Sequence, residues 1–153
     1  MGEVMIERWN SKLKPGDHLY IVGDISWSTY DWNQWYSRLN TKMVSIVWGN
    51  HDDPKTALKK YPWIASHGDI KVIKRDKQKI VLCHYAMKAW PFRNSGSAHC
   101  FGHSHGKLKG EGRSLDIGVD CFDFYPVEFS EVIELVKDIP IYVDGKLPEG
   151  GEI

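Results

Sequence analysis

Four short stretches of this sequence place metal-binding or acid–base side chains directly after apolar runs. They are Gly23-Asp24, Gly49-Asn50-His51-Asp52, His84 and Gly102-His103-Ser104-His105. The tetrapeptide at residues 49–52 is the most informative, because a chance match in a chain of this length is expected on the order of once in a thousand sequences. A packed core gives no reason for such side chains to recur at the ends of apolar runs.

The candidate metal ligands are one carboxylate, one side-chain amide and three imidazoles: Asp24, Asn50, His84, His103 and His105. Nitrogen and oxygen donors without a thiolate favour Mn²⁺, Fe, Zn²⁺, Co²⁺ or Ni²⁺ over a structural zinc finger. A carboxylate can bridge two cations about 3.5–4 Å apart, which activate water and neutralise phosphate oxygens. We therefore expect one or two divalent ions, with Mn²⁺ as the first choice.

His51 and Asp52 are the candidate catalytic residues. His51 follows the amide ligand on the other side of the loop, where it could protonate a leaving alkoxide or stabilise transition-state charge. Asp52 would orient the His51 ring. Arg93 either holds a phosphate oxygen bidentately or is a solvated loop residue. Aromatic residues just past strand ends are candidates for a pocket wall: Trp27, Tyr30, Tyr85, Trp90 and Phe92.

The elements that must position these side chains alternate between strand and helix early in the chain. Helices are predicted over residues 3–13, from about 28–29 through Leu39, after Asp53-Pro54, and from a Ser130 cap through Val136. Strands are predicted over 18–22, 43–48, 70–74, 79–83, 99–101 and 115–119, with an extended strand and loose tail over 140–153. This order favours a single α/β (α+β) sandwich domain over residues 1–153, with the polar clusters gathered at one sheet edge.

The overall composition is that of an ordinary globular domain. Lys plus Arg equals Asp plus Glu at 20 each, which counts against nucleic acid as a partner. The chain shows neither a signal peptide nor an apolar segment long enough to span a bilayer. Three cysteines without CxxC spacing favour reduced thiols and a cytoplasmic protein, with Cys83 and Cys100 as small buried side chains rather than ligands. We expect the numerous aromatic residues to serve mainly the core.

The ordered motifs Gly-Asp, Gly-Asn-His-Asp, a lone His and Gly-His-x-His resemble the calcineurin-like metallophosphoesterase family, in its small phage and bacterial members. The resemblance implies a four-layer β-sandwich flanked by helices and hydrolysis of small phosphoesters, as a phosphodiesterase or a broad phosphatase. It makes Asp24 the bridging ligand and His51 the catalytic imidazole. Asn50, His84 and His103 then complete the second metal site, and His105 serves the first.

One departure concerns the first metal site. The family opens with a strand carrying Asp-x-His, and this chain begins after the place of that strand. Candidate replacements are Asp116, Asp120, Asp123, His99 or a neighbouring subunit, and we expect a partner chain, most simply in a homodimer, to cover the resulting gap. Three outcomes are open: a one-metal enzyme, a rebuilt two-metal enzyme, or a degenerate relative that binds metal or a partner without turnover.

Overall fold

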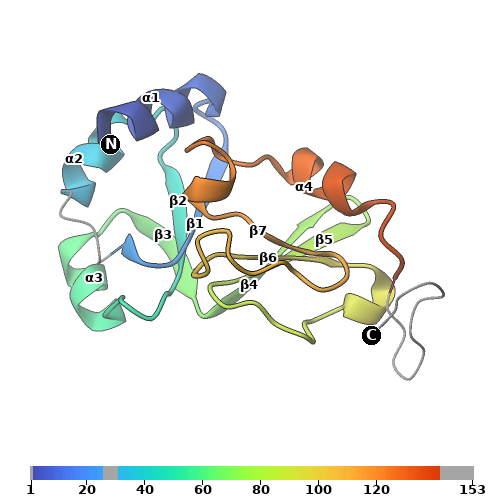
Figure 1. The fold of residues 1–153 in the computed structure, drawn as a ribbon. Coiled ribbons are helices and arrows are strands. Elements are labelled where there is room, and N and C mark those ends of the chain that lie inside the picture. Colours follow the sequence, from blue (N-terminus) through green and yellow to red (C-terminus); the bar gives the residue numbers. More distant parts are fainter. Residues whose placement is uncertain (1, 26–30, 142–153) are drawn as a thin grey trace.

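The computed structural model describes residues 2–25 and 31–141, which form two β-sheets and four α-helices (Figure 1). The first sheet contains the parallel strands β1 (His18–Val22), β2 (Met43–Val47) and β3 (Ile64–Gly68), in that order. The second contains β4 (Ile70–Arg75), β5 (Gln78–Cys83), β6 (Ala98–Phe101) and β7 (Ser114–Asp116), also in order. The hairpin β4–β5 is antiparallel, and β5, β6 and β7 are parallel. The predicted α/β class is confirmed.

Three helices share one buried core with the first sheet: α1 (Gly2–Lys12), α2 (Trp32–Arg38) and α3 (Pro54–Lys60). Tryptophan dominates this core through Trp9, Trp32, Trp35 and Trp48. The rings of Trp9 and Trp35 meet edge-on with centroids 5.8 Å apart, an arrangement that aromatic pairs favour. These tryptophans therefore serve the core, as predicted.

A second core joins the two sheets to α4 (Phe129–Val136). Val132 and Val136 of this helix pack with Leu82 and Cys100 of the second sheet, and Val47 of β2 belongs to the same cluster. Helices therefore pack against each sheet, and the second core joins the two sheets. The loops that follow several of the parallel strands meet at one edge of the sheets, which is where α/β proteins commonly bind ligands.

Strand β3 was not predicted from the sequence, and the predicted end of β7 and start of α4 were wrong. Residues 115–119 do not form one strand: β7 ends at Asp116, whose Oδ1 accepts the N–H of Gly118 at 2.8 Å, and the short 3₁₀ turn η3 (Val119–Cys121) follows. Helix α4 is capped by Glu128 rather than Ser130, through a capping box with Glu131.

Two predictions fall partly outside the described residues. Residues 28–29, the predicted start of the second helix, are not described, and the described helix α2 begins at Trp32 after Asp31 caps it by accepting the N–H of Asn33. Most of the predicted strand and tail over 140–153 also lies outside. Among the described helices, none has the length and apolar character needed to cross a membrane.

Candidate metal centre

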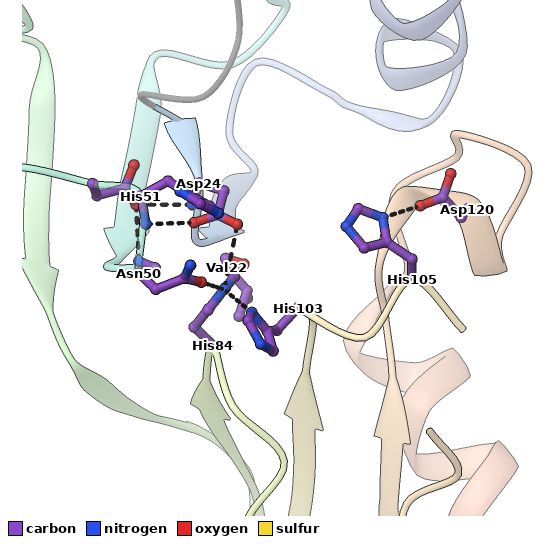
Figure 2. Close-up of polar contacts among 10 residues, drawn as sticks. Val22, Asp24, Asn50, His51, His84, His103, His105 and Asp120 are labelled. Atoms are coloured by element: carbon purple, nitrogen blue, oxygen red, sulfur yellow. Dashed lines mark hydrogen bonds and ion pairs between the residues drawn. The ribbon is translucent and has the colours of Figure 1, made fainter. Parts of the chain in front are cut away.

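The structure brings together four of the five candidate metal ligands, each from a loop that follows a strand (Figure 2). His84 Nε2 is the centre of the group. It lies 3.0 Å from Asn50 Oδ1, 3.2 Å from His103 Nδ1 and 3.4 Å from Asp24 Oδ2. Ligand atoms of Asp24, His84 and His103 all lie within 4.8 Å of one another, so these three side chains could hold a metal ion.

The chemistry of this donor set fits a divalent transition-metal ion. His84 Nδ1 donates to the carbonyl oxygen of Val22 at 3.2 Å, which leaves Nε2 with a lone pair. The oxygens of Asn50 and Asp24 face this atom, so all three groups could coordinate one cation placed among them. Separations of 3.0–3.4 Å are the edge lengths of an octahedron or tetrahedron with metal–ligand bonds of about 2.1 Å.

Two glycines leave the space that the group needs. A Cβ at Gly23 would lie 2.0 Å from His84 Nδ1, and the residue has φ +88°, so both the contact and the backbone require glycine. A Cβ at Gly49 would lie 2.2 Å from Asp24 Oδ1. The φ of Gly49 is not positive, so the close approach of Asp24, and not the backbone conformation, is what requires glycine there.

Asp24 and Asp52 fasten the loops after β1 and β2 to each other. The Asp52 carboxylate accepts the backbone N–H groups of Asp24 and Gly49, each at 2.8 Å. Asp24 Oδ1 in turn accepts the N–H of His51 at 3.1 Å, which directs Oδ2 toward His84. This bracing role of Asp52 is one that sequence reasoning missed, because it depends on a loop 28 residues away.

His51 is exposed and lines the cavity that adjoins the ligand group. Tyr85 lies on another side, with its ring centroid 5.1 Å from those of His84 and His103. Tyr85 therefore lies against two candidate ligands, and its role as a pocket wall stays a prediction. The catalytic roles of His51 and Asp52 stay predictions.

His105 lies apart from the other four candidates and points toward Asp120 (Figure 2). Its Nδ1 is 2.8 Å from Asp120 Oδ2, and both side chains are largely exposed. His103 and His105 both have positive φ, 64° and 51°, so the loop turns sharply between them and their side chains diverge. His105 and Asp120 therefore form a pair separate from the four-ligand group, and a first metal site there stays a prediction.

The other proposed replacements for first-site ligands have different partners. Asp116 accepts the N–H groups of Gly106 and Gly118, and thereby braces the loop that carries the histidines. Asp123 pairs with Arg8 at 2.6 Å. His99 is fully buried: Nδ1 donates to Val81 O at 3.1 Å, and Nε2 accepts the N–H of Met87 at 3.1 Å.

Arg93 and two of the proposed wall aromatics form a separate surface pocket of about 300 Å³. The Arg93 guanidinium lies over the ring of Trp90, 4.8 Å from its centroid, and Lys79 lies over Phe92. Trp90 is buried, so it supports this loop rather than lining the ion site. Trp27 and Tyr30 lie outside the described residues. The role of Arg93 in substrate binding stays a prediction.

Two of the cysteines are small buried side chains, as expected from the sequence. Cys83 and Cys100 are both buried, and burial raises the pKa of the Cys100 thiol to about 12. A thiol that stays protonated at neutral pH is a poor ligand for a metal ion. The donors of this centre are therefore nitrogen and oxygen.

A family model described as "Calcineurin-like phosphoesterase superfamily domain" matches residues 4–114. These residues include the five candidate ligands of the motifs, Asp24, Asn50, His84, His103 and His105. The chain belongs to the calcineurin-like phosphoesterase superfamily. Membership places it among predominantly hydrolytic proteins, with a possible His/Asp metal site at Asp24, His84 and His103.

The fold has a counterpart among solved structures. A crystal structure of the protein of unknown function AQ665 from Aquifex aeolicus is similar, with a TM-score of 0.68 and 24% sequence identity. The similarity covers 88% of this chain and 84% of that one, and it supports the α/β fold described above. No curated protein matches the chain.

Proposed function

We propose that this calcineurin-like phosphoesterase hydrolyses small phosphoesters, as a phosphodiesterase or a broad phosphatase, with a divalent metal ion. The observation that carries the proposal is the convergence of potential ligand atoms of Asp24, Asn50 and His103 on His84 Nε2, at 3.0–3.4 Å. They lie at the sheet edge where α/β proteins bind ligands, and they adjoin a large cavity.

Asp24, Asn50, His84 and His103 would hold the ion. When bound, such an ion lowers the pKa of a coordinated water and neutralises phosphoryl oxygens. The Val22 carbonyl keeps the His84 proton on Nδ1, so that Nε2 stays available. His51, exposed at the rim of the cavity, is placed to donate a proton to the leaving oxygen.

His105 and Asp120, together with Asp24, would hold a second ion. Mn²⁺ is our first choice, because imidazole, amide and carboxylate ligands suit it, while Fe, Zn²⁺, Co²⁺ and Ni²⁺ have compatible preferences. The separation of His105 from the four-ligand group favours a site that fills in two steps, with the four-ligand site first.

The test is hydrolysis of bis(p-nitrophenyl) phosphate with and without Mn²⁺. We expect Mn²⁺ to stimulate hydrolysis and expect Asn50→Ala and His84→Ala each to reduce it at least about 100-fold, since each removes a ligand. His67→Ala is the matched control, because this exposed histidine contacts Trp48 rather than the ligand group.

The competing hypothesis is a degenerate relative that binds metal without turnover. The distance of His105 from the ligand group is the observation that favours it. About one Mn²⁺ per chain, bound with Asn50- and His84-dependent affinity but with no hydrolysis of mono- or diesters, would establish this alternative and exclude the enzyme.

A further inference from the structure

The loop after β5 leaves the second sheet immediately beyond a candidate ligand. The carbonyl oxygen of His84 still accepts the N–H of Gly102 at 3.1 Å, which keeps this residue beside the end of β6. Residues 85–97 then run outside the sheet, and the chain returns to it as β6. The groups that hold the first residues of this loop therefore affect how the side chains next to His84 are presented.

A buried histidine of the adjacent strand holds the start of this loop. His99 Nε2 accepts the N–H of Met87 at 3.1 Å and lies 3.2 Å from the carbonyl oxygen of Tyr85. Both atoms belong to residues 85–87, so the backbone of this segment bends around one ring nitrogen. Nδ1 of the same ring donates to the Val81 carbonyl oxygen at 3.1 Å. The imidazole thus links β5 to segment 85–87.

The surroundings of His99 hold its ring in place and keep it neutral. The side chain is fully buried and lies against the rings of Trp90 and Phe101, with centroids 5.3 Å and 5.6 Å away. Burial lowers the pKa of His99, so at neutral pH Nε2 keeps the lone pair that accepts the N–H of Met87. The support that the ring gives to segment 85–87 is therefore fixed in both position and protonation.

Segment 85–87 in turn places the Tyr85 ring against two candidate ligands. The centroid of this ring lies 5.1 Å from that of His84, edge-on with planes 81° apart, and 5.1 Å from that of His103. His103 is exposed, so its imidazole is not held by burial. Contact with the neighbouring rings of Tyr85 and His84 is what limits its rotation.

We propose that His99 is a positioning residue that acts through Tyr85 on the imidazoles of His84 and His103. This inference rests on the proposed function, because it concerns how the ligands of the proposed ion site are held. Groups that orient metal ligands without touching the ion commonly change metal affinity by about 10- to 100-fold when they are removed. The fully buried His99 belongs to this class rather than to the ligands themselves.

The first test compares two substitutions of His99 that differ in reach. Glutamine extends about as far as Nε2, and its amide oxygen can accept the N–H of Met87. Asparagine extends only about as far as Nδ1 and leaves segment 85–87 without this support. We expect His99→Asn to weaken Mn²⁺ binding roughly tenfold in isothermal titration and His99→Gln to retain most of the affinity. Equal affinities in these two variants would overturn the proposal.

Ser97→Ala is the matched control for a general weakening of the loop. Ser97 Oγ accepts the N–H of Trp90 Nε1 at 3.1 Å and donates to Pro91 O at 2.8 Å, so it stabilises a later part of the same loop. This variant should bind Mn²⁺ as tightly as the unsubstituted protein. Circular dichroism and thermal melting verify that each variant folds.

A double-mutant cycle tests the route through Tyr85. Tyr85→Ala should weaken Mn²⁺ binding about as much as His99→Asn does. The two substitutions together should weaken it no further, because each removes the same contact with the ligand imidazoles. Losses that multiply in the double variant would overturn the route. Tyr85 is exposed, so its variant serves even where a His99 variant does not fold, and unchanged affinity in Tyr85→Ala would itself overturn the proposal.

A measurement without metal separates this inference from the proposed function. In NMR spectra of the metal-free protein, the ring current of Tyr85 should shift the ring protons of His84 and His103. We expect His99→Asn to move these signals toward their positions in Tyr85→Ala, and His99→Gln to leave them in place. Signals that stay in place in His99→Asn would overturn the inference. A protein that binds no Mn²⁺ would overturn the proposed function, and these signals would still decide whether His99 positions the two imidazoles.

Discussion

Gly49 contributes to the ion site by the space that it leaves empty. Its backbone conformation is one that any residue can adopt, but an added Cβ would lie 2.2 Å from Asp24 Oδ1 and 2.6 Å from the Asp24 nitrogen. These atoms are held in place, because the Asp24 N–H donates to the Asp52 carboxylate and Asp24 Oδ1 accepts the N–H of His51. The loop that carries Gly49 therefore cannot make room for a Cβ without moving Asp24.

Gly49→Ala should therefore weaken Mn²⁺ binding while the protein stays folded. We expect a loss of affinity of about 10- to 100-fold, which is typical when a group that orients a metal ligand is disturbed. Isothermal titration with Mn²⁺ measures the change. Gly16→Ala is the control, since nothing lies within 4 Å of a Cβ at that position and its φ is not positive. Equal affinities in the two variants would contradict the proposed site.

At the residue scale, the sequence predicted which side chains converge but not how they are held. The types and order of Asp24, Asn50, His84 and His103 were sufficient to group them. The tautomer of His84 depends on Val22 O, 62 residues away, and the divergence of His105 depends on two left-handed backbone positions. Such features arise from tertiary packing and leave no local pattern.

Helix α4 is joined to α1 through the carboxylate of Glu131. Glu131 accepts the N–H of Glu128 at 2.8 Å to complete the capping box, and it pairs with Lys12 at 2.7 Å. These hydrogen bonds, first that of the Glu128 N–H and then that of Lys12, lower the pKa of Glu131. The Glu131 side chain therefore caps the start of α4 and also connects α4 to α1.

Glu131→Ala should lower the free energy of unfolding by about 1 kcal/mol, mostly through loss of the cap. Glu134→Ala on the same helix removes an exposed pair with Lys137 and should cost less than about 0.5 kcal/mol. Urea denaturation measures both. A larger loss for Glu134→Ala would show that the capping box is not the stabilising feature.

At the element scale, strongly patterned segments were predictable and weakly patterned ones were not. β1, β2 and the β4–β5 hairpin have apolar runs or clear turns between strands. β3 reads Ile64-Ala65-Ser66-His67-Gly68, with one large apolar residue, and it becomes a strand by pairing with β2. Its Ser66 hydroxyl lies 2.7 Å from that of Ser45, a contact that appears only once the sheet is formed.

For the whole molecule, two histidines inside the fold couple stability to pH. His99 is fully buried between backbone partners, and His18 lies against Ser45 and Tyr20. Burial lowers the pKa of both, with a further contribution from Lys71 at His18. In the unfolded chain each histidine should titrate near pH 6.5.

The sign of the effect follows from these shifts. Below about pH 6.5 the unfolded chain binds protons that the folded protein does not, so acid favours unfolding. We expect the free energy of unfolding to stay nearly constant from pH 8 to 7. It should then fall between about pH 6.5 and 5, by at most about 1.4 kcal/mol per pH unit for each histidine.

Urea denaturation at a series of pH values, without metal, measures this slope. His99→Gln removes one titrating group and should flatten the decline, whatever its effect on absolute stability, because glutamine stays neutral. His67→Gln changes an exposed histidine and should leave the slope as it is. Two results would show that the folded protein accommodates a charged His99 imidazole. One is a free energy of unfolding that rises as the pH falls from 7 to 5.5, and the other is the same slope in His99→Gln as in the unsubstituted protein. A neutral His99 held by backbone hydrogen bonds would then not be the state of the folded protein.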